Sequence, residues 1–231
     1  RLRRLPLHLD TARRMLARIW HRRPRRVSAD EAYRRWAPVY PARAHNPLMV
    51  VEADAVASMV SPLGCRRGLD VGTGTGRNLA MLAAAGVPVT VGVDLSLAML
   101  QAASPRVRRV RATAYALPFV DGAFDLVTSS LMCGDVEHLD VWLSEAARIL
   151  APGGHLVYSD FHPAWATEGW TRSFTGADGR LYELPLHSHG IAEHVAALQQ
   201  CGFVLRERRE LRVAERAVPV AIVMHAVRVA R

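Results

Sequence analysis

The sequence predicts one doubly wound α/β domain with a seven-stranded, mostly parallel sheet. From about residue 68 onward, short β-branched runs alternate with Ala- and Leu-rich helical runs, the pattern of parallel strands joined by right-handed helical crossovers. The last two predicted strands, 203–213 and 217–229, have no helix between them. We expect them to pair as a hairpin, which places one antiparallel strand at the C-terminal end of the sheet. The chain has 231 residues, half of them hydrophobic, enough for one buried core.

The remaining elements follow from periodicity and from residues that begin or end helices. Residues 29–60 suggest two helical stretches interrupted by prolines. Ser96 is suited to cap a helix that Pro105 ends. A helix over 139–150 is strongly amphipathic, and Gly-containing turns follow it. The expected order is strand 68–71, helix 78–85, strand 87–93, helix 97–103, strand 107–111, strand 124–129, helix 139–150, strand 155–160 and helix 191–200, and then the hairpin.

The basic charge of the chain lies before this domain. Residues 1–35 contain 12 Arg and three acidic residues, and the rest of the chain is neutral, so the net charge of +9 belongs to the N-terminal region. We therefore divide the chain into a basic arm, 1–27, and a domain, 28–231. Three interpretations of the arm stay open: an extension without structure, a helix that contacts an anionic membrane surface or an acidic protein partner, and a nucleic-acid arm.

Composition also bounds the class of protein. The sequence has no apolar run long enough to span a membrane, and the arm lacks the apolar core of a secretory signal. The three cysteines are far apart in the sequence, which favours a reducing, cytoplasmic setting. The charge-neutral domain, without the aromatic and proline signature of base-flipping enzymes, argues against a nucleic-acid substrate.

The strongest local signal is the Gly-rich turn LDVGTGTGRN, residues 69–78, between a predicted strand and a predicted helix. Glycines there let a ligand approach the backbone closely. Asp94 ends the next strand, where a carboxylate can accept hydrogen bonds from ribose hydroxyls. The glycine spacing is G-x-G-x-G, which differs from the dinucleotide fingerprint and argues against a nicotinamide dehydrogenase. Asp70 suits an ammonium group, such as that of S-adenosylmethionine, better than a phosphate.

Four segments then make a resemblance explicit. LDVGTGTGRNLAML, VGVDLSLAML, ATAYALPFVDGAFDLVTSS and EAARILAPGGHLVYSD resemble, in order and spacing, the motifs of class I S-adenosylmethionine-dependent methyltransferases. The resemblance covers about residues 29–231 and implies a Rossmann-like fold. It departs from the family at Thr113 and Tyr115, where acids are common. The cofactor-binding residues it implies are Asp70, Gly72, Thr73, Gly74, Gly76, Asp94, Leu95, Thr113, Ala114, Tyr115 and Ser129.

We expect the methyl acceptor to be bound by the N-terminal helices and by residues 161–189, a substrate-side insertion without clear periodicity. Arg172, between two aromatic residues, is suited to bind an anion. His138 follows the fourth strand, where the family often has a histidine, and is the candidate general base, with helix capping as its alternative. The His-Ser-His segment 187–189 has poor spacing for a metal, so no metal site is expected. The candidate acceptor residues are Tyr40, His162, Arg172, His187 and His189.

The combination of AYRRWAPVYPARAHNPLM with YSDFHPAW, TRSF and LPLHSHG is similar to malonyl-acyl-carrier-protein O-methyltransferases. That similarity implies methylation of a carboxylate on a small or carrier-bound substrate, and the basic arm would attract an acidic carrier. Two alternatives remain. One is O-methylation of a hydroxyl on a secondary metabolite or quinone. The other is a protein that binds S-adenosylmethionine without catalysis.

Overall fold

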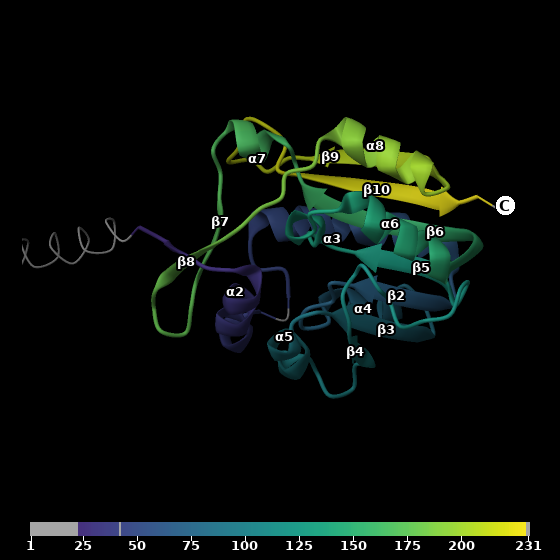
Figure 1. Cartoon of the computed structure of the whole chain (residues 1–231), viewed down its shortest axis with the longest axis horizontal. Helices are drawn as coiled ribbons and strands as arrows, with labels where there is room; N and C mark the ends of the chain where they lie inside the picture. The colour runs from purple at the N-terminus through teal and green to yellow at the C-terminus, as the bar shows by residue number, and fades with distance from the viewer. Residues whose placement is uncertain (1–22, 42, 230–231) are drawn as a thin grey trace, which may run out of the picture.

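The computed structural model describes residues 23–41 and 43–229, and a seven-stranded sheet forms its centre (Figure 1). The strand order is β4-β3-β2-β5-β6-β10-β9. Strand β10 is antiparallel to both β6 and β9, and the other neighbours are parallel. The predicted sheet and its C-terminal hairpin are therefore confirmed. The strands are β2 (Arg67–Val71), β3 (Val89–Asp94), β4 (Arg109–Arg111), β5 (Phe124–Ser129), β6 (Leu150–Phe161), β9 (Phe203–Leu211) and β10 (Ala221–Arg228).

The helices lie close to their predicted positions, and their first residues show why. Side chains of Ser28, Asn46 and Ser96 each accept a backbone N–H three residues further on, which satisfies a donor that the first helical turn leaves free. The α-helices are α2 (Ala29–Trp36), α3 (Pro47–Val60), α4 (Arg77–Ala84), α5 (Leu97–Ala102), α6 (Leu139–Ile149), α7 (Ala164–Thr167) and α8 (Ile191–Gln200), and the short 3-10 helices are η1 (Ala37–Val39), η2 (Ser61–Leu63) and η3 (Cys133–Asp135).

The two faces of the sheet carry separate apolar layers. Leu126 of β5 and Val157 of β6 pack in one layer with α3 and α4. Their chain neighbours Val127 and Leu156 pack in the other layer with α6 and α8. Successive strand side chains point to opposite faces, so the continuous hydrophobic runs of these strands serve both layers at once, as expected for a buried parallel sheet.

A second, smaller sheet is the main departure from the expected fold. Its order is β1-β8-β7, with β1 at Arg25–Arg26, β7 at Arg172–Thr175 and β8 at Leu181–Leu184. The insertion 161–189 thus contains a hairpin and the short helix α7. We call α2, η1 and the small sheet the cap, because they lie beyond the edge where the parallel strands end (Figure 1).

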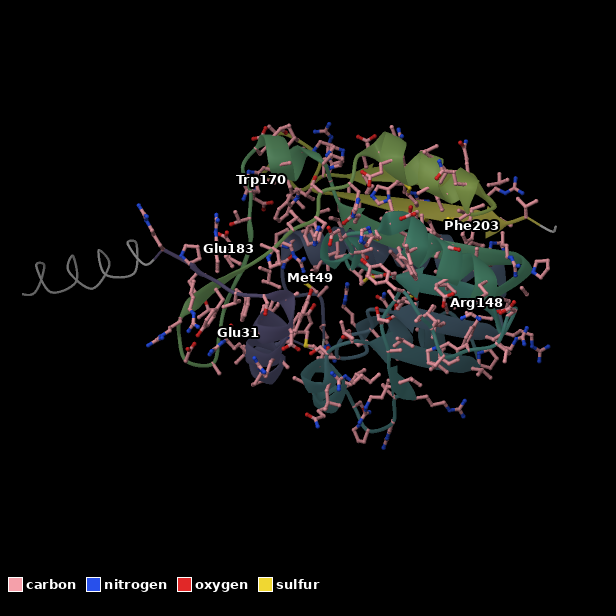
Figure 2. All side chains as sticks on the ribbon, viewed as in Figure 1. Glu31, Met49, Arg148, Trp170, Glu183 and Phe203 are labelled. Carbon is pink, nitrogen blue, oxygen red and sulfur yellow. The ribbon has the colours of Figure 1, made fainter. Side chains whose placement is uncertain are left out.

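Strand β1 places the last residues of the predicted basic arm in the small sheet. Arg25 and Arg26 lie beside Tyr182 and Glu183 in parallel register, and Arg26 forms an ion pair of 2.8 Å with Glu183. The folded part therefore includes the last residues of the predicted arm, and residues 1–22, on which the proposed membrane or partner helix falls, lie outside the described residues. Glu183 and Glu31 mark the cap in Figure 2, and Arg148 and Phe203 lie at the far end of the main sheet.

Among the helices of residues 23–41 and 43–229, none has the length and apolar character to span a membrane.

A histidine pair joins β6 to β10 away from the cap. The ring nitrogens Nδ1 of His155 and Nε2 of His225 are 3.0 Å apart. Partial burial lowers the pKa of His155. Burial, together with the neighbouring His155 ring, lowers the pKa of His225. The folded protein therefore takes up protons on this pair less readily than the unfolded chain does.

We predict that this pair makes the protein less stable in mild acid. Because the folded-state pKa values lie below the unfolded value of about 6.5, the stability they support is present above that pH and is lost as pH falls through it. Urea unfolding at pH 7.5 and 5.5 should show a larger loss for the wild type than for the H155Q/H225Q double variant, by less than about 1 kcal/mol because solvent screens the half-buried rings. Equal losses in both proteins would contradict this account.

Candidate functional site

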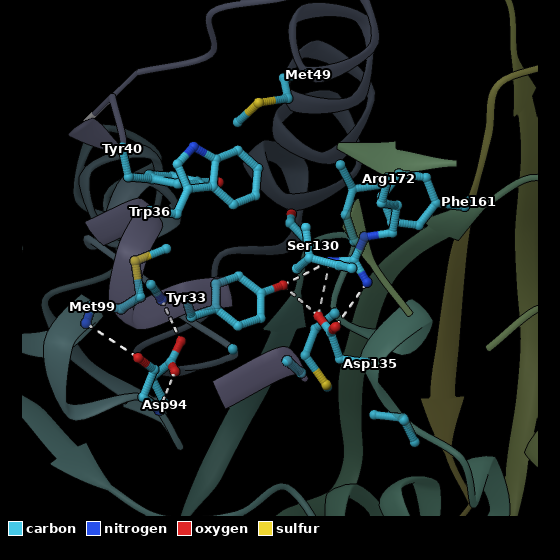
Figure 3. A pocket seen from close by; sticks show the side chains of 18 of the residues that line it. Tyr33, Trp36, Tyr40, Met49, Asp94, Met99, Ser130, Asp135, Phe161 and Arg172 are labelled. Carbon is cyan, nitrogen blue, oxygen red and sulfur yellow. Dashed lines mark hydrogen bonds and ion pairs between the residues drawn. The ribbon is translucent and has the colours of Figure 1, made fainter. Parts of the chain in front are cut away.

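A cavity of about 790 Å³ lies where the parallel strands of the main sheet end (Figure 3). Val71, Asp94 and Phe161 line it from the ends of β2, β3 and β6, and the cap contributes the facing wall through Tyr33 and Arg172. Ligands of open α/β sheets bind at this carboxyl edge. The cavity is therefore the candidate functional site.

The Gly-rich turn forms the floor of the cavity beside β2. The backbone N–H groups of Gly72 and Thr73 donate to the Val93 carbonyl at 2.8 and 2.9 Å, which folds the turn over β3. Gly72 has a φ of 73°, and a Cβ there would lie 2.5 Å from the side chain of Met132. A residue without a side chain is thus required by both backbone conformation and space.

Asp94 fastens this turn to the end of β3. Its Oδ2 accepts the N–H of Gly74 at 2.7 Å, and its Oδ1 accepts the N–H of Ser96 at 2.8 Å. Burial raises the pKa of Asp94 above its ordinary value, against the effect of these backbone donors. Each carboxylate oxygen keeps a further lone pair, and the side chain faces the cavity (Figure 3). Next to it, Leu95 is 62% exposed and offers an apolar surface.

Asp70 lies deeper, below the turn. Only 1% of the residue is exposed, and its Oδ1 accepts from the Asn78 amide at 3.0 Å and from the Thr128 hydroxyl at 2.8 Å. Burial raises the pKa of Asp70 to about 6, although these donors favour the ionised form. Asp70 lines a second, small cavity of about 40 Å³, which shares Gly72 and Arg77 with the main one. The carboxyl group is thus placed to receive a cation.

Arg77, at the start of α4, places a cation beside both cavities and pairs with a buried acid of α3. Arg77 is held through its Nη1 by Glu52 of α3 at 3.0 Å, and Glu52 is fully buried. The other Glu52 oxygen accepts from the Ser159 hydroxyl at 2.7 Å. Since Arg77 lines both cavities, its remaining N–H groups can bind an anionic end of a ligand while Asp70 receives a cationic one.

Three polar side chains from separate elements meet on the cap side of the cavity. Arg172 of β7 forms an ion pair with Asp135 of η3, with Nη1 to Oδ1 at 2.7 Å and Nη2 to Oδ2 at 3.1 Å. The same Nη2 donates to the Tyr33 hydroxyl of α2 at 2.7 Å, and that hydroxyl donates to Asp135 (Figure 3). Burial raises the pKa of Tyr33 well above its usual value, so the phenol stays protonated. We call these residues the Tyr33–Asp135–Arg172 cluster.

Aromatic rings enclose the space beside this cluster. Trp36 stacks on Phe174 with ring centroids 4.7 Å apart, and Tyr40 meets Trp36 edge-on at 4.8 Å. On the other side, Trp165 lies 4.8 Å from Phe161 in a T-shaped contact. Trp36, Tyr40, Phe161 and Trp165 all line the cavity. The wall therefore suits a flat apolar ligand, since aromatic side chains favour stacked and edge-on contacts with other rings.

Most predicted cofactor residues gather around the first half of the cavity. Two do not line either cavity: Gly76 begins α4 with a φ of 90°, and Ser129 is fully buried at the end of β5. The next residue, Ser130, lines both cavities instead, because side chains alternate along the strand. The predicted residues that line one or both cavities are Asp70, Gly72, Thr73, Gly74, Asp94, Leu95, Thr113, Ala114 and Tyr115.

The two predicted departures from the family pattern have structural explanations. The Thr113 hydroxyl accepts the N–H of Tyr115 at 3.3 Å. The Tyr115 hydroxyl accepts the N–H groups of Glu137 and His138 at 2.9 and 3.2 Å. Thr113 therefore supports the turn after β4, and Tyr115 joins the connection between β4 and β5 to the segment between η3 and α6, while both residues line the cavity.

The candidate acceptor residues divide in the same way. Tyr40 and Arg172 line the cavity, and His162, His187 and His189 do not. His138, the candidate base, is exposed at the first position before α6 and also does not line the cavity. His187 and His189 follow the β7–β8 hairpin and lie beside η3 and the residue after it, through the Gly134 and Val136 carbonyls. His162 precedes the hairpin and lies 3.4 Å from Glu210 of β9. Contact of these rings with the acceptor stays a prediction.

Sequence reasoning missed several cavity residues. Tyr33 and Trp36 lie on one face of α2, three residues apart, a spacing that also marks an ordinary core helix. Asp135 lies in η3, shortly after β5 ends at the sheet edge where ligands bind, and that position was the available signal. Arg77 occupies the position where the dinucleotide fingerprint has its third glycine, and the sequence pattern gave it no role in binding. Within the described residues, no group of three or more His, Cys, Asp or Glu is arranged to hold a metal ion.

Comparison with known proteins gives matches in sequence and fold. Residues 69–158 match the family model described as a methyltransferase domain. The demethylmenaquinone methyltransferase of Tropheryma whipplei is 34% identical over 156 residues, 58% of this chain and 65% of that protein. The protein of the same name from Clavibacter sepedonicus is 40% identical over 113 residues, 46% of each. The chain thus spans about half to two thirds of the length of these curated relatives.

A solved structure matches more of the chain. The S-adenosylmethionine dependent methyltransferase from Mesorhizobium loti superposes with a TM-score of 0.64 and covers 77% of this chain and 98% of its own. Its sequence identity is 24%, so this likeness shows the fold.

A glycine in β3 supports the Gly-rich turn by its lack of a side chain. A Cβ at Gly92 would lie 2.7 Å from Thr73 and 2.9 Å from Leu79. We predict that Gly92→Ala pushes Thr73 outward and destabilises the protein by about 1–3 kcal/mol, the usual cost of overpacking. Urea unfolding checks this. Gly190→Ala is the matched control, because a Cβ there meets nothing within 4 Å, and similar losses in the two variants would refute the steric explanation.

Proposed function

We propose that this chain is a class I S-adenosylmethionine-dependent methyltransferase and that it methylates a hydroxylated aromatic ring of quinol type. The observation that carries the proposal is the division of the cavity. One half, along β2 and β3, has the charges and surfaces that a nucleoside with an amino-acid tail requires. The other half, under the cap, is walled by aromatic rings and contains a carboxylate paired with an arginine.

The first half fits S-adenosylmethionine group by group. Asp94 would accept from the ribose hydroxyls, and Leu95 would cover the adenine. Asp70 and Arg77, whose charges are opposite, would hold the ammonium and the carboxylate of the methionine end. When bound, the cofactor supplies a methyl group that its sulfonium has already activated. The protein must then align the acceptor and exclude water, and the aromatic wall supports both tasks.

Asp135 is the group in the second half that can take a proton. It forms a two-point ion pair with Arg172, at 2.7 and 3.1 Å. Its Oδ1 accepts from Arg172 alone within the cluster and keeps a further acceptor position, whereas Oδ2 already accepts from both Arg172 and Tyr33. A phenolic hydroxyl has an ordinary pKa near 10 and gains from a general base. The proton of the ring hydroxyl would pass to Asp135 as the new bond to the methyl carbon forms and the sulfur–carbon bond breaks.

The same arrangement serves transfer to oxygen or to carbon. Loss of the hydroxyl proton places electron density on the ring oxygen and on the adjacent ring carbon. The name demethylmenaquinone methyltransferase, which the sequence relatives carry, agrees with an acceptor of this class. We include both positions in the proposal, because the aromatic wall would hold the ring in either case.

A carboxylate acceptor, which the malonyl-carrier resemblance implied, has less support. Arg172, the residue expected to bind it, is 8% exposed and already paired with Asp135. A second carboxylate placed there would face Asp135 and be repelled by it. The neutral hydroxyl of a ring meets no such cost.

The cofactor assignment predicts the effect of Asp94→Ala. Loss of two hydrogen bonds to a charged group should weaken S-adenosylmethionine by roughly 1.5–3 kcal/mol, a 10- to 150-fold higher Kd. Isothermal calorimetry on the purified chain measures this, with NADH as a parallel ligand that should not bind. Asp121→Ala is the control, because its side chain is 79% exposed and pairs with Arg148 outside the cavity. Unchanged affinity in Asp94→Ala would remove the assigned cofactor site.

The acceptor assignment predicts a different result for Asp135→Asn. Turnover of a hydroxynaphthoquinol should fall by about 10²–10⁴, the usual contribution of a general base, whereas the Kd for S-adenosylmethionine should stay within about twofold. Asp30→Asn, a carboxylate-to-amide change at the exposed rim of the same cavity, is the control. Thermal unfolding monitors the loss of the Arg172 ion pair. Methylation of malonyl thioesters in preference to ring hydroxyls would overturn the proposal.

A further inference from the structure

Behind the aromatic half of the cavity, a buried histidine joins two segments of the chain. His189 is 4% exposed and lies just before α8. Its Nε2 is 2.7 Å from the Val136 carbonyl, and its Nδ1 is 2.7 Å from Oε1 of Glu193, which lies in the first turn of α8. The ring therefore bridges the segment after η3 and the start of α8.

Both partners of this ring only accept hydrogen bonds. A carbonyl oxygen and a carboxylate have no hydrogen to offer, and a neutral imidazole carries a hydrogen on only one of its two nitrogens. Both contacts are hydrogen bonds at the same time only when the ring is the imidazolium. A neutral ring keeps one bond and presents a lone pair to the other acceptor. The geometry thus records the protonated form.

The charges around the ring agree with this. Glu193 faces it directly from α8, and the fully buried His194 of the same helix lies with its ring centre 5.7 Å away. His194 in turn contacts Asp160 of β6 at 3.1 Å. Burial of His189 opposes protonation, but the hydrogen bonds to Glu193 and Val136 and the nearby carboxylate of Asp160 outweigh it, so the pKa of His189 lies above its ordinary value.

The bridge holds the residues on both sides of Asp135. The N–H of His187 donates to the Gly134 carbonyl at 2.9 Å, and His189 donates to the Val136 carbonyl. Asp135 lies between these two anchored residues. Gly134 is also packed closely, because a Cβ there would lie 2.7 Å from Leu186. The segment 186–189 therefore fixes the backbone that presents the Asp135 carboxylate to the cavity.

We propose that protonated His189 is a positioning residue for Asp135, so that the acceptor half of the cavity is correctly formed only while this ring carries its second proton. The inference rests on the proposed function, because it assigns the support of the base named there. His189 reaches the acceptor only through Val136 and the backbone. Asp94 and the Gly-rich turn are held by hydrogen bonds to β3 and to the start of α5, separate from this bridge, so we expect them to stay in place when the ring loses a proton. Tyr115 touches the held segment through the N–H groups of Glu137 and His138.

The consequence is a limit on the high-pH side of the turnover profile. Both anchors are present below the pKa of His189, and one is lost as pH rises through it. Turnover of the ring acceptor should fall there, and the Kd for S-adenosylmethionine should not change with the same midpoint. Glu193→Gln keeps an oxygen that can accept from the ring but removes the charge, so it should move the midpoint to lower pH.

The experiment combines NMR with the pH profile of turnover. In protein labelled at histidine nitrogen and valine methyl positions, the ring nitrogens of His189 and the methyl groups of Val136 should titrate with one midpoint. The Glu193→Gln variant should shift that midpoint and the falling limb of the turnover profile together. Glu137→Gln is the matched control, because Glu137 is exposed on the same loop and its loss should leave both midpoints in place.

The outcomes separate the two proposals. If ring acceptors are not methylated at any pH, the proposed function fails, and the NMR titration still tests the bridge in the cofactor-bound chain. If His189 titrates while Val136 and the turnover profile do not follow it, the positioning role is overturned. His189→Gln, which like neutral imidazole has one donor group and one acceptor group, should behave at every pH like the wild type above the pKa of His189. Should that variant fail to fold, Glu193→Gln decides the question.

Discussion

The buried ion pair between Arg172 and Asp135 is the contact on which the architecture of the site depends. It joins a strand of the cap to the segment that follows the fifth strand of the chain, and Tyr33 adds α2 to the same point. Burying such charges costs several kcal/mol per ion, which only close pairing and further hydrogen bonds offset. Each of the three side chains therefore requires the other two, and the cap can cover the sheet edge only in one position. The aromatic wall then follows, because Trp36 and Phe174 are fixed by the same elements.

The two halves of the cavity differ in how far apart their residues lie along the sequence. The cofactor half is made by β2, the Gly-rich turn, α4 and β3, which follow one another within residues 67–94. Its requirements are local: a turn with positive φ, a strand that ends in a carboxylate, and a helix start next to both. The acceptor half is assembled from α2, η3 and β7. About a hundred residues separate Tyr33 of α2 from Asp135 of η3, and about forty separate Asp135 from Arg172 of β7. One half can be altered without the other, since few side chains belong to both.

This difference explains how much could be predicted from the sequence. The main sheet, its terminal hairpin and most residues around the Gly-rich turn were predictable, because periodicity and the spacing from Asp70 to Asp94 are local patterns. The small sheet was not, because β7 and β8 have four residues each, too few for a clear alternation. Ser129 and Ser130 differ by one position along a strand, and only the strand's orientation decides which one faces the cavity. The roles of Tyr33, Asp135 and Arg172 depend on contacts across the fold that no local pattern records.

The position of the cluster also links acceptor binding to the stability of the cap. Tyr33 and Arg172 are cavity walls and, at the same time, the groups that bind the cap to Asp135. An acceptor that takes a hydrogen bond from either group, or gives one to Asp135, competes with the contacts that keep the cap in place. By thermodynamic linkage, these contacts weaken the binding of such an acceptor to the same degree as the acceptor weakens them. One set of three side chains therefore contributes both to acceptor affinity and to the stability of the cap.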